Sequence, residues 1–251
     1  MRLSGKTAIV TGAASSGGYG AGIAQRFAQE GARVACVDID GAGAERLAAE
    51  IGGAARGFAC DVASGASVAA LIAAVEAAFG GFDILVNNAA ISQKPSRLAR
   101  IAEAEVDRLF AINVKSLYHA AVHALPVLRK RGGGVVINIA SVTAIRPRPG
   151  MAWYNATKAA VISLTHSMAA ELAPDRIRVN GIAPAVGRTP MLGQMFPEGA
   201  DAAGARLVET IPLGRLCEPA DVAAAAVYLA SDVAGFVTGA VLPVDGGRLV
   251  G

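Results

Sequence analysis

Cysteine is scarce in this chain of 251 residues, and Cys36, Cys60 and Cys217 stand far apart. Three isolated cysteines exclude a disulfide framework and a Cys-x-x-Cys metal or redox motif. We therefore interpret them as small buried hydrophobic residues. His119 and His123 have the i, i+4 spacing of a metal pair, but no glutamate or third ligand accompanies them. The sequence thus predicts no metal site, and we interpret both histidines as helix-surface or subunit-contact residues.

Charge and long apolar runs are also sparse. Charged residues make up 17% of the chain, with 23 Lys and Arg against 20 Asp and Glu. The basic residues are scattered, which argues against nucleic acid as a partner. No run reaches the roughly 18 to 20 apolar residues of a membrane span, so alanine and glycine account for the mean hydropathy of +0.46. Because the N-terminus has no signal core, we expect a cytoplasmic protein with no membrane partner.

Short apolar runs alternate with longer alanine-rich stretches almost to the end of the chain. This pattern is typical of parallel strands joined by crossover helices. The expected strands are residues 7–11, 33–38, 57–61, 83–87, 134–140, 177–180 and 240–244, and the expected helices are residues 20–30, 42–51, 64–79, 103–130, 152–173 and 219–230. The sequence predicts an α/β protein with a Rossmann-type, doubly wound parallel sheet of about seven strands and helices on both faces.

One domain spanning residues 1–251 is the economical organisation, since no linker, repeat or low-complexity segment divides the chain. The longest departure from the alternation covers residues 185–218, which are rich in Gly, Pro and Met. An insertion after the carboxyl end of a strand usually lies over the ligand crevice of such a sheet. We therefore expect a substrate-covering lid there, with a short helix inside it.

Glycines punctuate the turn between the first expected strand and the first helix. Gly12 opens this turn, and Gly18 and Gly20 close it on either side of Tyr19. Backbone amides at a helix start bind a pyrophosphate only when no Cβ blocks its approach. The turn therefore predicts a dinucleotide site.

Asp38 ends the second expected strand, 18 residues beyond Gly20. That interval is close to the roughly 20 residues at which a carboxylate accepts the adenosine ribose hydroxyls. A 2′-phosphate would bring a second anion against Asp38, and no Lys or Arg occurs between residues 34 and 44, so we predict NAD rather than NADP. The alternative is a capping or loop role for Asp38, with Asp40 as the ribose ligand. Asp61, followed by Val62, either reaches the adenine or caps a helix.

Tyr154 and Lys158 are four residues apart and share one helical face. Proton transfer near pH 7 requires the tyrosine pKa of about 10 to fall by about three units, or about 4 kcal/mol. A cation about 4 Å away at an effective dielectric near 20 supplies an energy of that order. Ser141 lies 13 residues before Tyr154, at the end of the fifth expected strand. Its hydroxyl is placed to hydrogen-bond a substrate oxygen.

Together these features resemble the short-chain dehydrogenase/reductase family, in its Tyr-x-x-x-Lys branch. The likeness covers essentially the whole chain and includes Thr11 before Gly12, the run Asn87-Asn88-Ala89-Ala90, Asn113, Ser141, Pro184, Thr189 and the ending Val244-Asp245-Gly246-Gly247. The resemblance implies cofactor contacts from Asn88, Ala89, Pro184, Gly187 and Thr189. It also implies a homotetramer, formed through the long helices that begin near Glu103 and Ala152.

The resemblance further implies a division of catalytic roles. Tyr154 would be the general acid in reduction and the general base in oxidation, while Lys158 would lower its pKa and bind the nicotinamide ribose. Ser141 would hold the carbonyl or alcohol oxygen. Asn113 would kink its helix and fix a water that links Lys158 to solvent.

The chain departs from the family pattern at two loops. Five residues separate Gly12 from the Gly-x-Gly pair, where family members usually have three. Enoyl-carrier-protein reductases share the longer loop, but they place six residues between Tyr and Lys, so the three found here argue against that activity. The usual Pro-Gly after the sixth strand is Pro184-Ala185, with Gly187 two residues on, which puts the geometry of that loop in question.

We therefore expect an NAD-dependent oxidoreductase that interconverts a secondary alcohol and a ketone by hydride transfer. One alternative is an NADPH-dependent 3-oxoacyl-[acyl-carrier-protein] reductase, although such reductases tend to carry an arginine at the place of Ala170. A remoter one is a non-catalytic nucleotide-binding protein, which would usually lose the Tyr or the Lys. The small-molecule substrate stays open, because fold and cofactor do not set the pocket. Gln93, Lys94, Arg146 and Arg148 lie in loops expected to open toward it, where they either recognise an anionic or hydroxylated group or are simply solvated.

Overall fold

The computed structural model describes residues 1–196 and 199–251. The strands of these residues form one parallel sheet with the order β3-β2-β1-β4-β5-β6-β7. The strands are β1 (Thr7–Thr11), β2 (Arg33–Asp38), β3 (Ala55–Ala59), β4 (Ile84–Asn87), β5 (Gly134–Ile139), β6 (Ile177–Pro184) and β7 (Val241–Val244). The helices are α1 (Tyr19–Gln29), α2 (Gly41–Ile51), α3 (Gly65–Phe79), α4 (Glu103–Phe110), α5 (Ser116–Lys130), α6 (Ala152–Leu172), α7 (Pro190–Met195), α8 (Ala200–Val208) and α9 (Pro219–Ala230). The predicted Rossmann-type sheet is confirmed, and its strand order reverses between β1 and β4.

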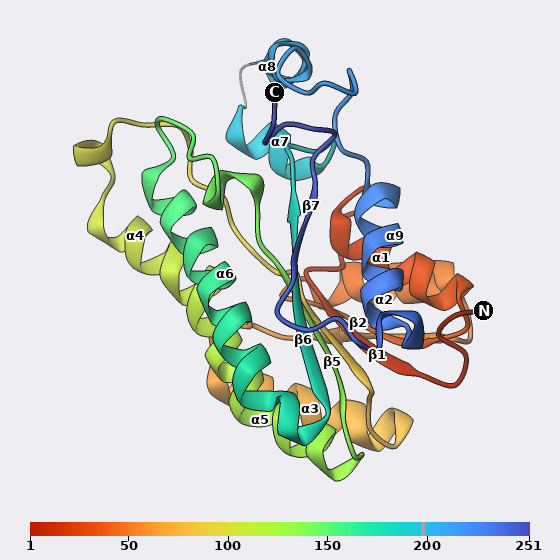
Figure 1. Cartoon of the computed structure of the whole chain (residues 1–251). Coiled ribbons are helices and arrows are strands. Elements are labelled where there is room, and N and C mark those ends of the chain that lie inside the picture. Colours follow the sequence, from red (N-terminus) through yellow and green to blue (C-terminus); the bar gives the residue numbers. More distant parts are fainter. Residues whose placement is uncertain (197–198) are drawn as a thin grey trace.

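Helices cover both faces of the sheet, with α1, α2 and α9 on one side and α3, α5 and α6 on the other (Figure 1). Successive residues of β1 enter different cores, because side chains alternate along a strand. Val10 packs in the core beneath α1 and α9, whereas Ile9 packs in the core beneath α3 and α5. Burial on both faces explains why the central strands are mainly apolar.

Several predicted boundaries were wrong. β3 lies two residues earlier than expected, because Ala55 pairs in register with Val34 of β2. β6 runs four residues beyond Asn180. The expected helix over residues 103–130 is interrupted by a π-helical turn over Ala111–Lys115. The segment expected to form a lid, residues 185–218, holds two short helices, α7 and α8, rather than one, and its residues 197–198 lie outside the described residues.

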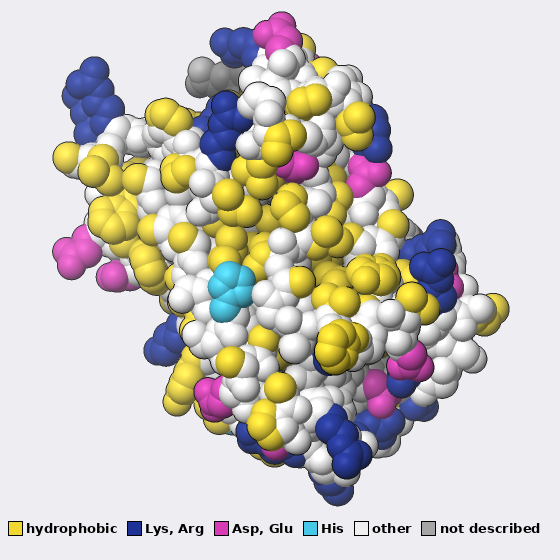
Figure 2. Space-filling view, in the orientation of Figure 1, with side chains coloured by type: hydrophobic (Ala, Val, Ile, Leu, Met, Phe, Trp, Pro, Cys, Tyr) yellow, Lys and Arg dark blue, Asp and Glu magenta, His cyan; other side chains and the backbone are white. Residues whose placement is uncertain are grey.

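The surface and the cysteines follow the composition. The three cysteines are free and buried, as expected. Basic and acidic side chains are interspersed over the face shown in Figure 2. Within the described parts of the chain, no helix combines the length and the apolar character needed to cross a membrane.

Candidate active site

Three side chains predicted to be catalytic line one cleft of about 480 Å³. Ser141 stands just beyond the carboxyl end of β5, where it caps a short 3₁₀ turn. Tyr154 and Lys158 come from the first two turns of α6. The Ser141 hydroxyl accepts hydrogen bonds from the Thr143 amide, at 3.2 Å, and from the Thr143 hydroxyl, at 3.1 Å. The carboxyl edge of the sheet thus brings together residues that are distant in the chain.

The start of α6 is fixed by Gln93, a residue expected to open toward the substrate. Gln93 is instead 1% exposed. Its side-chain oxygen accepts hydrogen bonds from the amides of Trp153 (3.1 Å) and Tyr154 (3.2 Å), and its amide donates to the Gly150 carbonyl (2.9 Å). Because the first amides of a helix have no partner inside it, Gln93 satisfies two of them and holds Tyr154 in place. No local pattern in the sequence indicates this long-range cap.

Lys158 is buried and donates from Nζ to the Ile139 carbonyl at 2.8 Å. Its Nζ lies 5.9 Å from the centroid of the Tyr154 ring. Burial lowers the pKa of Lys158 to about 8. It also raises the pKa of Tyr154 to about 12, and the Ser141 hydroxyl offsets only part of that rise. Burial therefore shifts the pKa of Tyr154 in the direction opposite to the lowering that the resemblance implies for Lys158, because removal from water disfavours the charged phenolate.

Asn113 sits in the π-helical turn, so the implied kink of its helix is present. Its side-chain oxygen accepts from the Ile91 amide at 2.9 Å, and its Nδ2 donates to the Ile91 carbonyl at 3.0 Å. Nδ2 also donates to Thr157 Oγ1 at 3.1 Å, and that hydroxyl donates to the Tyr154 carbonyl at 2.8 Å. Asn113 therefore joins the loop after β4 to the catalytic turn of α6 through Thr157, a residue that the sequence analysis missed.

A groove of about 340 Å³ lies along the predicted dinucleotide site. Predicted cofactor residues that line it are Gly12, Gly18, Tyr19, Asp38, Asp61, Val62, Asn88, Ala89 and Thr189. Pro184 and Gly187 line the catalytic cleft instead. Tyr19, Asn88 and Thr189 border both spaces. The groove and the cleft are therefore adjacent, as a dinucleotide beside its substrate requires.

The glycine-rich turn fits a pyrophosphate. Gly18 is the N-cap of α1, where no side chain caps the helix and no acidic residue occupies the first turn. Gly12 has a φ of +68°, and a Cβ there would meet the Asn88 side chain at 2.7 Å. A Cβ on Gly20 would collide with the Gly12 carbonyl, so Gly20 serves close packing beneath the groove rather than lining it. The uncapped amides and the helix dipole at this end favour an anion.

The structure separates the two candidate ribose ligands. Asp38 borders the groove and accepts hydrogen bonds from the amides of Ala14 (2.9 Å) and Asp40 (3.1 Å). Asp40 instead caps α2 by accepting from the Gly43 amide at 3.0 Å. Asp61 also borders the groove, while Ser64 caps α3. The helix N-caps are thus Asp40 and Ser64 rather than Asp38 and Asp61. The Asp61 carboxylate accepts from the Ala63 amide in the turn before α3, at 2.9 Å, and Asp38 holds the loop amides of Ala14 and Asp40 while it borders the groove.

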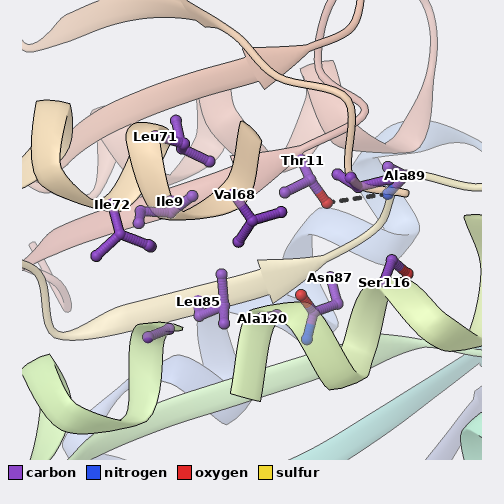
Figure 3. Close-up of a pocket in the computed structure, with 12 residues that line it drawn as sticks. Ile9, Thr11, Val68, Leu71, Ile72, Leu85, Asn87, Ala89, Ser116 and Ala120 are labelled. Atoms are coloured by element: carbon purple, nitrogen blue, oxygen red, sulfur yellow. Dashed lines mark hydrogen bonds between the residues drawn. The ribbon is translucent and has the colours of Figure 1, made fainter. Parts of the chain in front are cut away.

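Beneath the groove, Thr11 ties the end of β1 to the loop after β4. Its hydroxyl accepts from the amides of Asn88 and Ala89, both at 3.0 Å, and donates to the Val86 carbonyl at 3.2 Å. Figure 3 shows this bond to Ala89 beside a small space lined mainly by apolar side chains between α3 and α5. That space has a volume of about 20 Å³, enough for about one water. The space is too small to hold a cofactor or a substrate.

Tyr19 explains the unusual loop after β6. Its hydroxyl donates to the Ala185 carbonyl at 3.1 Å, and a Cβ on Gly187 would collide with that hydroxyl. Tyr19 approaches the backbone at position 187, so the glycine is required there, two residues later than in the usual family pattern. The longer glycine loop and the changed loop after β6 can both be seen in the sequence. Only the fold shows that they are in contact, through the hydrogen bond from Tyr19 to Ala185.

His119 and the metal-ligating residue types lie outside the catalytic group of side chains. His119 is buried rather than on the helix surface, and its Nε2 has no partner among the described residues. Across residues 1–196 and 199–251, no three His, Cys, Asp or Glu side chains gather closely enough to hold a metal ion.

Comparisons with known proteins place the chain in a family. A family model described as enoyl-(acyl carrier protein) reductase matches residues 12–248. The chain is 45% identical to 4-formylbenzenesulfonate dehydrogenase of Comamonas testosteroni, over 99% of both chains. It is 44% identical to D-threitol dehydrogenase of Mycolicibacterium smegmatis, over 100% of this chain and 95% of that one. A crystal structure of 3-ketoacyl-(acyl-carrier-protein) reductase from Brucella melitensis complexed with NADH superposes with a TM-score of 0.93 at 44% identity, over 99% of this chain and 100% of that one. The chain therefore belongs to the short-chain dehydrogenase/reductase family, as an NAD(P)-dependent enzyme that acts on CH–OH groups.

Proposed function

We propose that this protein is an NAD-dependent oxidoreductase that interconverts a secondary alcohol and a ketone, with Tyr154 as general acid and base. The observation that carries the proposal is the placement of Ser141, Tyr154 and Lys158 in one cleft beside the groove that contains Asp38. The nicotinamide, when bound, supplies or accepts the hydride. The Ser141 hydroxyl holds the substrate oxygen, and the Tyr154 phenol delivers the proton to it in reduction.

The pKa values of Tyr154 and Lys158 determine which of the two groups is protonated before the reaction. With the pKa of Tyr154 at about 12, the phenol is protonated at neutral pH and ready to act as an acid. With the pKa of Lys158 at about 8, the lysine is mainly a cation at pH 7. When the phenol gives up its proton, the positive charge of the lysine stabilises the phenolate that remains. In oxidation the phenol must first give up its proton, and the phenolate then accepts the proton of the alcohol.

Asp38 supports NAD over NADP. Its carboxylate borders the groove, and no basic residue flanks it between residues 34 and 44. The alternative, an NADPH-dependent 3-oxoacyl reductase, draws support from Arg108 of α4, which also lines the groove. Initial rates with NADH and NADPH separate the two proposals. We expect a preference for NADH, and a strong preference for NADPH would refute the role of Asp38.

The experiment on the catalytic role is Tyr154→Phe. We expect turnover to fall by about 10²- to 10⁴-fold, the usual contribution of a general acid, while NADH binding and thermal unfolding stay near those of the wild type. Tyr118→Phe is the matched control, because Tyr118 is an exposed tyrosine on α5. Turnover retained by Tyr154→Phe would refute the assignment.

We also propose a homotetramer formed through the outer face of α4, α5 and α6. A groove on this face is lined by Phe110, Val114, Leu117, Tyr118, Leu164 and Met168. Tyr118 is 62% exposed, and Figure 2 shows hydrophobic side chains along the edge that α4 and α5 form in Figure 1. An apolar face of this kind marks an interaction surface.

The substrate class is not fixed by the relatives. 4-Formylbenzenesulfonate is an anion, whereas D-threitol carries no charge.

A further inference from the structure

Three arginines line the catalytic cleft. Arg146 and Arg148 belong to the loop that joins β5 to α6, and Arg248 belongs to the segment after β7. Arg146 Nη1 donates to the Arg248 carbonyl at 2.8 Å and also to the Gly251 carbonyl. These bonds join two segments that are 102 residues apart in the chain. The fold thus concentrates positive charge beside the space that admits the substrate.

Arg148 is held rather than freely solvated. Its guanidinium carbon lies 4.9 Å from the centroid of the Phe196 ring, which follows α7 in the expected lid segment. A guanidinium over an aromatic face is attracted to it. Burial lowers the pKa of Arg148, and the charge of Arg248 lowers it further. Arg148 and Arg248 line the same cleft, so an anion bound there would offset the like charge of the two guanidiniums.

The lining provides no such anion. Among the described residues, the cleft is lined by no Asp or Glu. The ion pairs found between described residues involve other basic side chains and none of these three arginines. Arg148 and Arg248 therefore line the cleft without an acidic partner among the described residues, in contrast with Arg131, which pairs with Asp83 at 2.7 Å.

The other side chains that line the cleft indicate that the body of the ligand is apolar. Met151, Met191, Leu192 and Met195 line the same cleft, with Tyr154 at its reactive side. Unbranched methionines adapt to an apolar ligand of irregular shape. The cleft therefore offers a hydroxyl and phenol for a carbonyl oxygen, an apolar wall, and guanidiniums that match the geometry of a carboxylate or sulfonate.

We propose that Arg148 and Arg248 bind an anionic group of the substrate, and that the substrate is an alcohol or ketone with an apolar body and a carboxylate or sulfonate away from the reacting carbon. Arg146 is the positioning residue, since its bonds to the carbonyls of Arg248 and Gly251 hold the C-terminal segment against the cleft. The assignment rests on the proposed function, because it names the substrate class of the same cleft.

The test compares two ketones that differ only in charge, 4-acetylbenzoate and 4-acetylbenzamide. Binding to the NAD-saturated enzyme is measured by calorimetry, since NAD and a ketone form a complex that does not turn over. We expect the wild type to bind the acid at least about 10-fold more tightly than the amide. Arg148→Gln and Arg248→Gln should each weaken binding of the acid by about 10- to 100-fold, the range for hydrogen bonds to a charged group. Binding of the amide should change by less than about twofold.

Two further variants control for charge and folding. Arg97→Gln removes an exposed arginine outside the cleft and should leave both affinities unchanged. Arg148→Lys keeps the cation and should retain part of the preference for the acid. Equal binding of acid and amide by the wild type, or equal weakening of both by the two Gln variants, would overturn the anion site.

The same reagents separate this proposal from the proposed function. Tyr154→Phe should keep the preference for the acid over the amide, because both ketones lose the same hydrogen bond, while it loses reduction of the acid by NADH. Tight, arginine-dependent binding of the acid without any reduction by the wild type would overturn the proposed function and support the anion site. Equally efficient reduction of acid and amide would overturn the anion site and support the proposed function.

Discussion

Burial of Lys158 predicts a specific dependence of stability on pH. Burial lowers the pKa of Lys158 from 10.5 to about 8, which corresponds to about 3 kcal/mol of destabilisation while the lysine is charged in both states. Between these two pKa values the unfolded chain binds more protons than the folded one, so stability rises with pH. The penalty is fully present below about pH 8 and falls to about 1 kcal/mol at pH 10.

Lys158→Met removes this pH-dependent term. It also leaves the Ile139 carbonyl without its 2.8 Å partner, which costs about 1 to 3 kcal/mol at every pH. The two effects nearly cancel at pH 7, where we expect a small difference between variant and wild type. By pH 10 the variant should have become about 2 kcal/mol less stable relative to the wild type, because the wild type alone is relieved of its buried charge.

Urea denaturation of the two proteins at pH 7, 8, 9 and 10 measures this difference. Burial raises the pKa of Cys36 to about 12 and that of Cys217 to about 11, so both thiols reduce stability as pH rises above about 9. These terms occur in both proteins and cancel in the difference. Lys130→Met, at the exposed end of α5, should give a difference that does not change with pH. A constant difference between Lys158→Met and the wild type from pH 7 to 10 would refute the assigned environment of Lys158.

Two more predictions concern packing. Gly187→Ala should destabilise the protein by about 1 to 3 kcal/mol in urea, the usual range for overpacking, because the new Cβ meets the Tyr19 hydroxyl. Tyr19→Phe should restore most of the loss in the double variant, and additive effects would contradict the contact. Tyr118→Glu should reduce the mass measured by size-exclusion chromatography with light scattering, because it places a charge on the exposed apolar face of α5; an unchanged tetramer mass would remove α5 from the interface, and Tyr118→Phe is the control.

Features set by local pattern were predictable from the sequence. The strands near the centre of the sheet are buried on both faces, so β1 and β2 were predicted at their observed boundaries. β3 lies at the edge of the sheet, and its residues are partly buried or exposed, so the apolar signal there is too weak to fix the register. β6 was predicted too short because Gly181 and Pro184 interrupt the pattern, although the strand stays buried throughout. Strand boundaries follow from the sequence where buried apolar residues fill the middle of the strand, as in β1 and β2.

The catalytic side chains were predicted because their spacing is local, whereas their supports come from distant segments. Gln93 fixes Tyr154 from 61 residues away, and Asn113 reaches Thr157 from 44 residues away. Neither partner is marked by a spacing rule, since the loop after β4 meets α6 only through the sheet topology. The direction of the Tyr154 pKa shift was not predictable from the sequence either, because the i, i+4 spacing shows the neighbouring cation but not the desolvation of the phenol.

The charged side chains of the described residues that line the cleft are all positive. Lys158 is satisfied by a backbone carbonyl rather than by a carboxylate, and the described lining adds three arginines and no acid. Unopposed positive charge in a partly water-excluded cleft stabilises any negative charge that develops there. The oxygen of a reacting ketone gains negative charge as hydride arrives, and the phenolate that remains after proton transfer is also an anion. The same positive charge therefore assists the reaction at Tyr154 and attracts an anionic substrate, so neutralising the arginines should weaken both binding of the acid and its rate of reduction.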